Sequence, residues 1–109
     1  MNWINLTTSQ QVDDIKQKSF QRPQVIFKHS THCSISNMVL NRLNRSDIPD
    51  NIDFYYLDLI AHKDISLKIA NNFQIPHQSP QILIIKEGNA VYEESHMAIS
   101  MDEITERVS

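Results

Sequence analysis

The stretch that decides the fold is VIFKHSTHCSIS, residues 25–36. It opens with the continuous apolar run Val25–Phe27, which is typical of a strand buried on both faces. A polar segment, His29–Cys33, follows. From Ile35 onward, apolar residues recur at helical spacing. The order predicts a central strand, a short polar loop and a helix that begins just after Cys33.

The segments on either side alternate in the same way. Apolar runs predict further strands over residues 3–6, 54–57, 82–85 and 91–92. Capping boxes at Thr8 and Ser100 and a capping carboxylate at Asp64 predict three more helices. Residues 87–89 have the composition of a hairpin turn. The expected order is β-α-β-α-β-α-β-β-α, an α/β fold with parallel strands first and an antiparallel edge last.

Length and composition exclude several classes of protein. The 109 residues suit one domain, residues 1–109. Gly88 is the only glycine, so a Rossmann fingerprint and a P-loop, which need several glycines, are excluded. The 13 acidic and 10 basic side chains give a net charge of −3 without a basic block. We therefore expect no nucleic-acid partner.

The chain carries one cysteine, Cys33. An internal disulfide, a C-x-x-C pair and a multi-cysteine zinc cage are therefore excluded. No apolar run approaches the ~20 residues of a membrane span, and residues 1–5 do not read as a secretory signal. We expect a cytoplasmic protein without a membrane partner, in which Cys33 stays a free thiol.

Cys33 lies where the polar loop gives way to the helix. Backbone N–H groups and the helix dipole favour an anion there, and the thiolate is the nucleophilic form of cysteine. An inert cysteine usually packs as a small hydrophobe, whereas these flanking residues are polar: Ser30, Thr31, His32 and Ser34. We predict a reactive thiol at Cys33, with Thr31, His32 and Ser34 shaping the site.

Two further residues bear on this chemistry. Ser36 stands where a C-x-x-C oxidoreductase has its resolving cysteine. Serine cannot attack a mixed disulfide, so an adduct on Cys33 can be released only by an external thiol. Ser36 can also accept a hydrogen bond from a free N–H of the first helical turn. The expected order of elements, with a cysteine where the second strand gives way to a helix, is similar to that of a thioredoxin-like fold. In such a fold a cis-proline precedes the strand at 82–85 and the backbone before it can pair with substrate, which is the place of Ser79 and Pro80.

A metal site is the competing interpretation of this region. Zinc favours such ligands, and the candidates are His29, His32 and Cys33, with His77 or His96. Their spacing matches no closed site, so we expect no metal.

These residues resemble those of the monothiol bacilliredoxins, the thioredoxin-like redox proteins of the bacillithiol system. The resemblance covers nearly the whole chain. It rests on FKHST at 27–31 with CSIS at 33–36, YYLDLI at 55–60, HQSPQ at 77–81 and SHMAI at 95–99. The first and third stretches together are distinctive. The chain departs from the family in having Ser34 where a proline is usual and His32 where threonine or an arginine-type residue is usual.

The resemblance implies a thioredoxin-like fold, a central mixed sheet flanked by helices. It also implies a cytosolic monothiol oxidoreductase that removes bacillithiol from S-bacillithiolated proteins by forming a mixed disulfide. Cys33 matches the active cysteine, Ser36 the serine in the resolving place, and Pro80 the cis-proline. Bacillithiol is then a thiol co-substrate, and bacillithiol or another thiol reductant regenerates Cys33. Because bacillithiol carries carboxylates, we expect Lys28 and His29 to help bind it.

Two alternatives stay open at this point. One is a thioredoxin-like module with an inert cysteine that binds peptides in the groove at Ser79–Pro80. The other is an iron–sulfur carrier of the monothiol glutaredoxin kind, with one cysteine per subunit and a small thiol. Rapid alkylation of Cys33 counts against the first alternative, and a brown protein after anaerobic purification supports the second.

Overall fold

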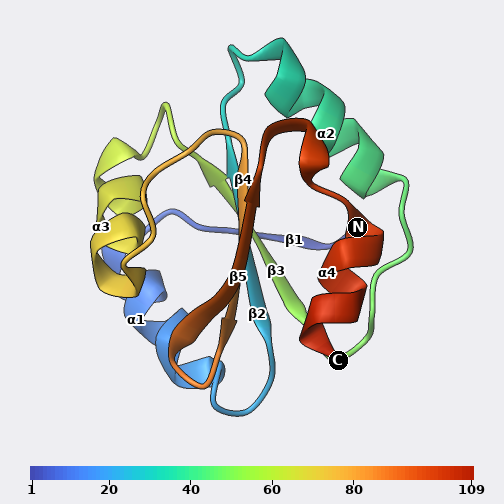
Figure 1. The fold of residues 1–109 in the computed structure, drawn as a ribbon. Coiled ribbons are helices and arrows are strands. Elements are labelled where there is room, and N and C mark those ends of the chain that lie inside the picture. Colours follow the sequence, from blue (N-terminus) through green and yellow to red (C-terminus); the bar gives the residue numbers. More distant parts are fainter.

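Five strands form one mixed sheet in the computed structural model, which describes residues 1–109 (Figure 1). The elements follow the predicted order, with one short 3-10 helix, η1, added before the last helix. Their bounds are β1 Trp3–Asn5, α1 Ser9–Lys18, β2 Gln24–His29, α2 Ser34–Asn44, β3 Asp53–Asp58, α3 Lys63–Phe73, β4 Gln81–Lys86, β5 Asn89–Ser95, η1 His96–Ala98 and α4 Met101–Val108.

The strands lie in the order β1-β3-β2-β4-β5. β3 pairs in parallel with both β1 and β2, whereas β4 is antiparallel to β2 and β5. The prediction of early parallel pairing with an antiparallel edge is confirmed. β2 is the middle strand and is buried from Gln24 to His29, so it continues beyond the apolar run that marked it in the sequence.

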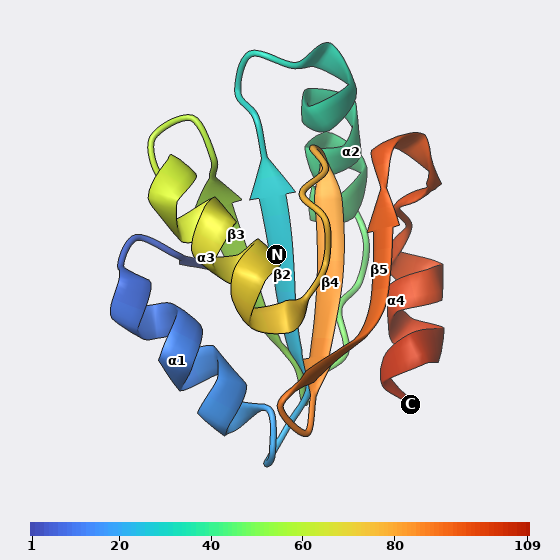
Figure 2. The same cartoon turned by 60° about the vertical axis from the view of Figure 1, so that its left-hand side comes forward.

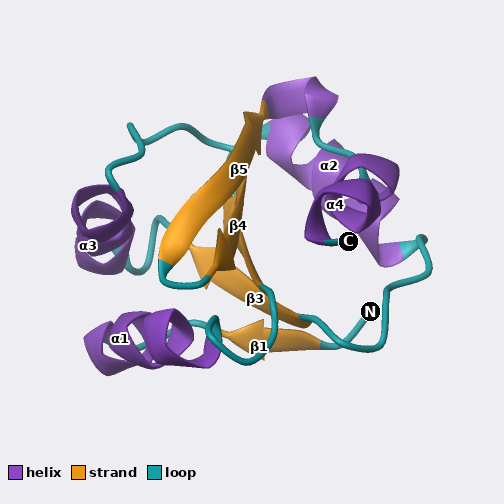
Figure 3. Ribbon diagram, turned by 60° about the horizontal axis from the view of Figure 1, so that its bottom comes forward, coloured by secondary structure: helices purple, strands orange, loops and turns teal.

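Helices cover both faces of the sheet, with α1 and α3 on one side and α2 and α4 on the other (Figure 3). Side chains of β2 alternate between the two cores that result. Ile26 packs into the core under α1 and α3. Val25 and Phe27 pack into the core under α2 and α4. The two cores fix the register of β2 and thereby the end of the strand that leads to Cys33.

The helix starts agree with the capping signals in two places and differ in one. Thr8 and Gln11 form the complete capping box of α1, and the Ser100 hydroxyl accepts the N–H of Glu103 at the start of α4. The predicted cap at Asp64 is wrong, because α3 begins two positions earlier than that cap implies and His62 is its N-cap. Asp64 lies instead in the first turn, where a carboxylate interacts favourably with the helix dipole.

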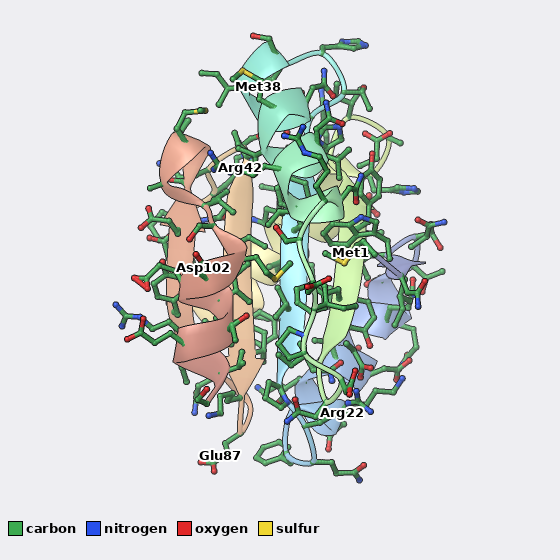
Figure 4. All side chains as sticks on the ribbon, turned by 90° about the vertical axis from the view of Figure 1, so that its right-hand side faces the viewer. Met1, Arg22, Met38, Arg42, Glu87 and Asp102 are labelled. Atoms are coloured by element: carbon green, nitrogen blue, oxygen red, sulfur yellow. The ribbon has the colours of Figure 1, made fainter.

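One edge of the sheet gathers four segments that are far apart in the sequence. In Figure 2 the ends of β2, β3 and β5 and the start of β4 all lie at the upper edge. The loop before α2, the loop before α3, the loop that enters β4 and η1 therefore lie around the same end of the molecule. At the other end lies the β4–β5 hairpin with Glu87 at its tip (Figure 4).

The only glycine belongs to that hairpin. Glu87 and Gly88 have φ angles of 52° and 81°, which matches the two positive φ values of a type I′ turn. A Cβ added to Gly88 would lie 2.8 Å from the ring of Phe20, so a side chain there would require that exposed ring to move. The predicted turn at 87–89 is confirmed.

Candidate functional site

Cys33 is the N-cap residue of α2, as the sequence indicated. Its backbone is extended, with φ −109° and ψ 119°, and its thiol makes no capping hydrogen bond. The Cys33 N–H donates to the carbonyl of Ser30 at 3.2 Å, and the Cys33 carbonyl accepts the N–H of Asn37 at 3.0 Å. The side chain is partly exposed. The thiol is therefore neither buried as a small hydrophobe nor engaged as a cap.

The flanking residues predicted to shape the site are exposed, namely Thr31, His32 and Ser34. Ser36 differs from them, because its side chain is fully buried. Its hydroxyl accepts the N–H of Ser30 at 3.1 Å and lies 2.7 Å from Nδ1 of His29. Ser36 does bond a backbone N–H, but that of Ser30 in the loop before α2 and not one in the first turn of the helix. The sequence did not indicate its second partner, His29.

His29 is the last residue of β2, and its ring lies among aromatic side chains. Its centroid is 5.8 Å from that of Phe27 and 5.4 Å from that of Tyr56. Trp3 extends the cluster, 5.7 Å from Phe27. Burial lowers the pKa of His29, and the Asp58 carboxylate partly offsets this by raising it. Burial in this cluster therefore favours a neutral imidazole.

Lys28 points into the opposite core, as the alternation of β2 requires. Its side chain is fully buried. The amine donates to the Ser66 carbonyl at 3.5 Å and to Nδ1 of His77 at 3.4 Å, and burial lowers its pKa to about 8. We expected Lys28 and His29 to help bind a ligand, but in this structure neither side chain reaches the surface. Lys28 is 0% exposed and His29 2%; the Lys28 amine contacts Ser66 of α3 and His77, and His29 contacts Ser36 of α2.

The peptide bond between Ser79 and Pro80 is cis, as expected. The Pro80 carbonyl accepts the N–H of His96 at 3.0 Å, which ties the loop before β4 to the end of β5. The Ser79 hydroxyl oxygen is buried without a hydrogen-bond partner. Pro80 directly precedes β4 and Cys33 directly precedes α2, so both belong to the edge of the sheet where β2 ends and β4 begins.

The segment His96–Ile99 packs beside α2, and Arg42 fastens it there. One Arg42 nitrogen, Nη2, donates to the Met97 carbonyl at 2.9 Å and also to the Ile99 carbonyl. Figure 4 shows Arg42 on α2, with Met38 nearer the Cys33 end of that helix. The sequence placed Arg42 within the helix but gave no signal for this contact.

No three His, Cys, Asp or Glu side chains are arranged to hold a metal ion. Two of the candidate histidines have other partners: His29 bonds Ser36, and Nδ1 of His77 accepts a hydrogen bond from Lys28. The helices of the fold are all too short or too polar to cross a membrane.

Comparisons with solved structures agree with this architecture. A provisionally described oxidoreductase with a thioredoxin fold superposes with a TM-score of 0.82 at 25% identity, over 94% of this chain and 90% of its own. Thioredoxin from Malassezia sympodialis gives 0.72 at 14% identity, over 98% and 88% of the two chains. Thioredoxin from Fasciola hepatica gives 0.68 at 17%, over 95% and 94%.

The fold is therefore that of thioredoxin. The family model described as monothiol bacilliredoxin BrxC matches residues 4–104, which include the Cys33 loop, the cis-proline and η1. A partly exposed single thiol at a helix N-cap, with a serine in the resolving place, is consistent with that match. The chain is a thiol oxidoreductase of thioredoxin fold and belongs to the monothiol bacilliredoxin family.

Proposed function

We propose that this protein removes bacillithiol from S-bacillithiolated proteins through single-cysteine exchange at Cys33. The Cys33 thiolate attacks the bacillithiol sulfur of the mixed disulfide. A Cys33–bacillithiol disulfide forms while the bond from bacillithiol to the protein sulfur breaks, and that sulfur leaves with the electron pair and takes up a proton. A second thiol then attacks the bacillithiol sulfur, forms its own disulfide with bacillithiol and returns Cys33 to the thiol.

The observation that carries this proposal is the unequal placement of Cys33 and Ser36. Cys33 is partly exposed at the start of α2 and its side chain caps nothing. Ser36 is buried and its hydroxyl is bonded within the protein. No other thiol exists in the chain, so an adduct on Cys33 requires an outside thiol for its release.

Bacillithiol carries carboxylates, and a small set of groups on the surface around Cys33 can form hydrogen bonds with them. The first-turn N–H groups of α2 point toward this end of the helix. The His32 imidazole and the hydroxyls of Thr31 and Ser34 are exposed beside Cys33. We assign the contacts with bacillithiol to these groups, since Lys28 and His29 are buried.

The protein that carries bacillithiol needs a docking surface of its own. The backbone before Pro80 suits an extended segment. Apolar side chains are exposed on α2 and η1, among them Ile35 at 38%, Met38 at 56% and Met97 at 45%. We propose that the substrate segment runs along the Ser79–Pro80 loop and covers these side chains, and that the reaction takes place in the cytosol, where thiols stay reduced.

The test is a transfer experiment read by intact-mass spectrometry. Reduced protein is incubated with a bacillithiolated model protein and, separately, with the same model carrying glutathione. Bacillithiol mass is expected on the wild type and not on Cys33→Ser, with faster transfer from the bacillithiolated model. If glutathione moves equally fast, the proposed ligand is wrong. If neither thiol moves although Cys33 alkylates readily, the proposed reaction is wrong as well.

A further inference from the structure

The end of β2 and the first turn of α2 are joined by a buried polar contact beneath the Cys33 loop. Nδ1 of His29 lies 2.7 Å from Oγ of Ser36, and the same oxygen accepts the N–H of Ser30 at 3.1 Å. His29 is 2% exposed and Ser36 0%. Oγ of Ser36 does not meet bulk water, so its hydroxyl proton needs a partner within the protein.

That requirement fixes the position of the protons. The Ser36 oxygen already accepts the N–H of Ser30, and its own hydroxyl proton needs an acceptor. Nδ1 of His29 is the acceptor within reach. Nδ1 is therefore unprotonated and the ring proton lies on Nε2. A proton on Nδ1 would take the place of the hydroxyl proton and leave it unpaired.

The contact continues to the reactive residue through Ser30. The Ser30 N–H is held by Ser36, and the Ser30 carbonyl accepts the N–H of Cys33 at 3.2 Å. In the turn that carries the thiol, both backbone polar groups of Ser30 are therefore hydrogen-bonded, the N–H to Ser36 and the carbonyl to Cys33. We call the bonded pair of His29 and Ser36 the buried latch.

We propose that the buried latch is a positioning device: His29 and Ser36 hold the Ser30–Cys33 turn in the geometry for thiol–disulfide exchange while His29 is neutral, and hold it less firmly when His29 is protonated, because the Ser36 hydroxyl proton then loses its acceptor. The inference rests on exchange at Cys33 as proposed above. Ser36 then does more than occupy the place of a resolving cysteine, because it positions the turn that carries Cys33. His29 takes part in the same positioning and does not bind the ligand.

The surroundings of His29 agree with a neutral ring. The groups around it are Phe27 from β2, Tyr56 and Asp58 from β3, and Ser36 from α2. Asp58 is the charged group among them and raises the pKa of His29, but burial lowers it and is the larger effect. The Ser36 hydroxyl therefore has its acceptor at neutral pH and loses it on acidification below the ordinary histidine pKa of 6.5.

Three substitutions separate the latch from general stability. Ser36→Ala removes the hydroxyl, and His29→Phe keeps a ring against Phe27 and Tyr56 but removes Nδ1. His29→Asn retains a polar group near the position of Nδ1 and serves as the rescue variant. Ser46→Ala is the matched control, because Ser46 lies beyond the other end of α2 and its hydroxyl bonds the Arg42 carbonyl.

The readout is the rate of exchange of Cys33 with the aromatic disulfide DTNB, which does not depend on bacillithiol. Ser36→Ala and His29→Phe are expected to react roughly tenfold more slowly than wild type, His29→Asn to recover most of the rate, and Ser46→Ala to match wild type. The ratio of wild-type to His29→Asn rates should fall as pH drops through the His29 pKa, because the thiol titration is common to both. Imidazole ¹⁵N shifts of the wild type should show unprotonated Nδ1 at neutral pH.

The outcomes distinguish the two proposals. Wild-type rates in folded Ser36→Ala and His29→Phe, a pH-independent rate ratio, or a protonated Nδ1 at neutral pH would each overturn the latch. If DTNB exchange follows the expected pattern but bacillithiol never moves to Cys33, the latch stands and the proposed ligand fails. If Ser36→Ala or His29→Phe does not fold, the latch is tested by the pH dependence of the ratio of wild-type to His29→Asn rates and by the ¹⁵N shifts of the wild type.

Discussion

The amine of Lys28 lies 3.4 Å from Nδ1 of His77, and no carboxylate lies within ion-pair distance of that amine. A fully buried lysine usually has an acidic partner. Here burial lowers the pKa of Lys28 to about 8, and burial together with the Lys28 charge lowers the pKa of His77. The β2 strand thus carries one buried basic side chain on each face, Lys28 on one and His29 on the other.

Replacing Lys28 by methionine is expected to stabilise the fold at pH 7. The charged amine loses its hydration on burial and gains no ion pair, so a methionine of similar length should raise the free energy of unfolding by about 1–3 kcal/mol. Urea denaturation of wild type and Lys28→Met measures the difference. Lys63→Met, at an exposed position in the first turn of α3, is the control and should change little.

The pH dependence of that difference follows from the direction of the pKa shift. The Lys28 pKa falls from 10.5 to about 8 on folding, so between these values the unfolded chain binds more protons and stability rises with pH. The advantage of Lys28→Met should be full below pH 8 and shrink toward pH 10.5. An advantage that stays constant across this window, or a less stable variant at pH 7, would contradict a desolvated Lys28.

Ser36→Cys should convert the protein into a dithiol enzyme. A thiol at this position in the first turn of α2 is placed to attack an adduct on Cys33, forming an internal disulfide and releasing bacillithiol. Intact masses of bacillithiolated samples, followed over time without added thiol, should show loss of bacillithiol from Ser36→Cys only. Ser46→Cys, with its thiol at the far end of α2, is the control; equal persistence of the adduct in Ser36→Cys and wild type would refute this role of position 36.

Arg42→Met tests the attachment of the His96–Ile99 segment. Arg42 donates to the carbonyls of Met97 and Ile99, and loss of both bonds leaves two carbonyls short of a partner. We expect a loss of about 1–3 kcal/mol in stability and faster amide hydrogen exchange from Met97 to Ser100. Arg45→Met removes an exposed arginine from the end of the same helix. An equal effect of the two substitutions would show that the carbonyl contacts are not what holds the segment.

Much of the fold could be read from local pattern. The capping box at Thr8, the start of α2 after Cys33 and the hairpin at 87–89 depend on nearest neighbours along the chain. The cis-proline at Pro80 followed from the predicted fold. The first three features are set by hydrogen bonds and dihedral angles within a few residues, which the sequence displays directly, whereas the cis-proline was expected only because the fold was.

The functions of Lys28 and His29 could not be read in that way. Both are polar and stand next to the polar loop in the sequence, which favours a place at the surface. In the structure Lys28 pairs with Leu57 of β3 on one side and with Gln81 of β4 on the other. Pairing with these two strands extends β2 beyond the apolar residues Val25–Phe27. Burial of these side chains then depends on which loops cover the sheet edge, and that is a property of the tertiary fold.

The central claim is that Cys33 alone accepts bacillithiol and holds it. The most direct measurement is the intact mass of wild type and Cys33→Ser after reaction with a bacillithiolated protein, before and after adding an outside thiol. The account predicts one bacillithiol per wild-type chain, none on Cys33→Ser, an adduct that persists without added thiol, and full release when a thiol is supplied. Bacillithiol on Cys33→Ser, or none on a wild type whose thiol is reduced, would contradict it.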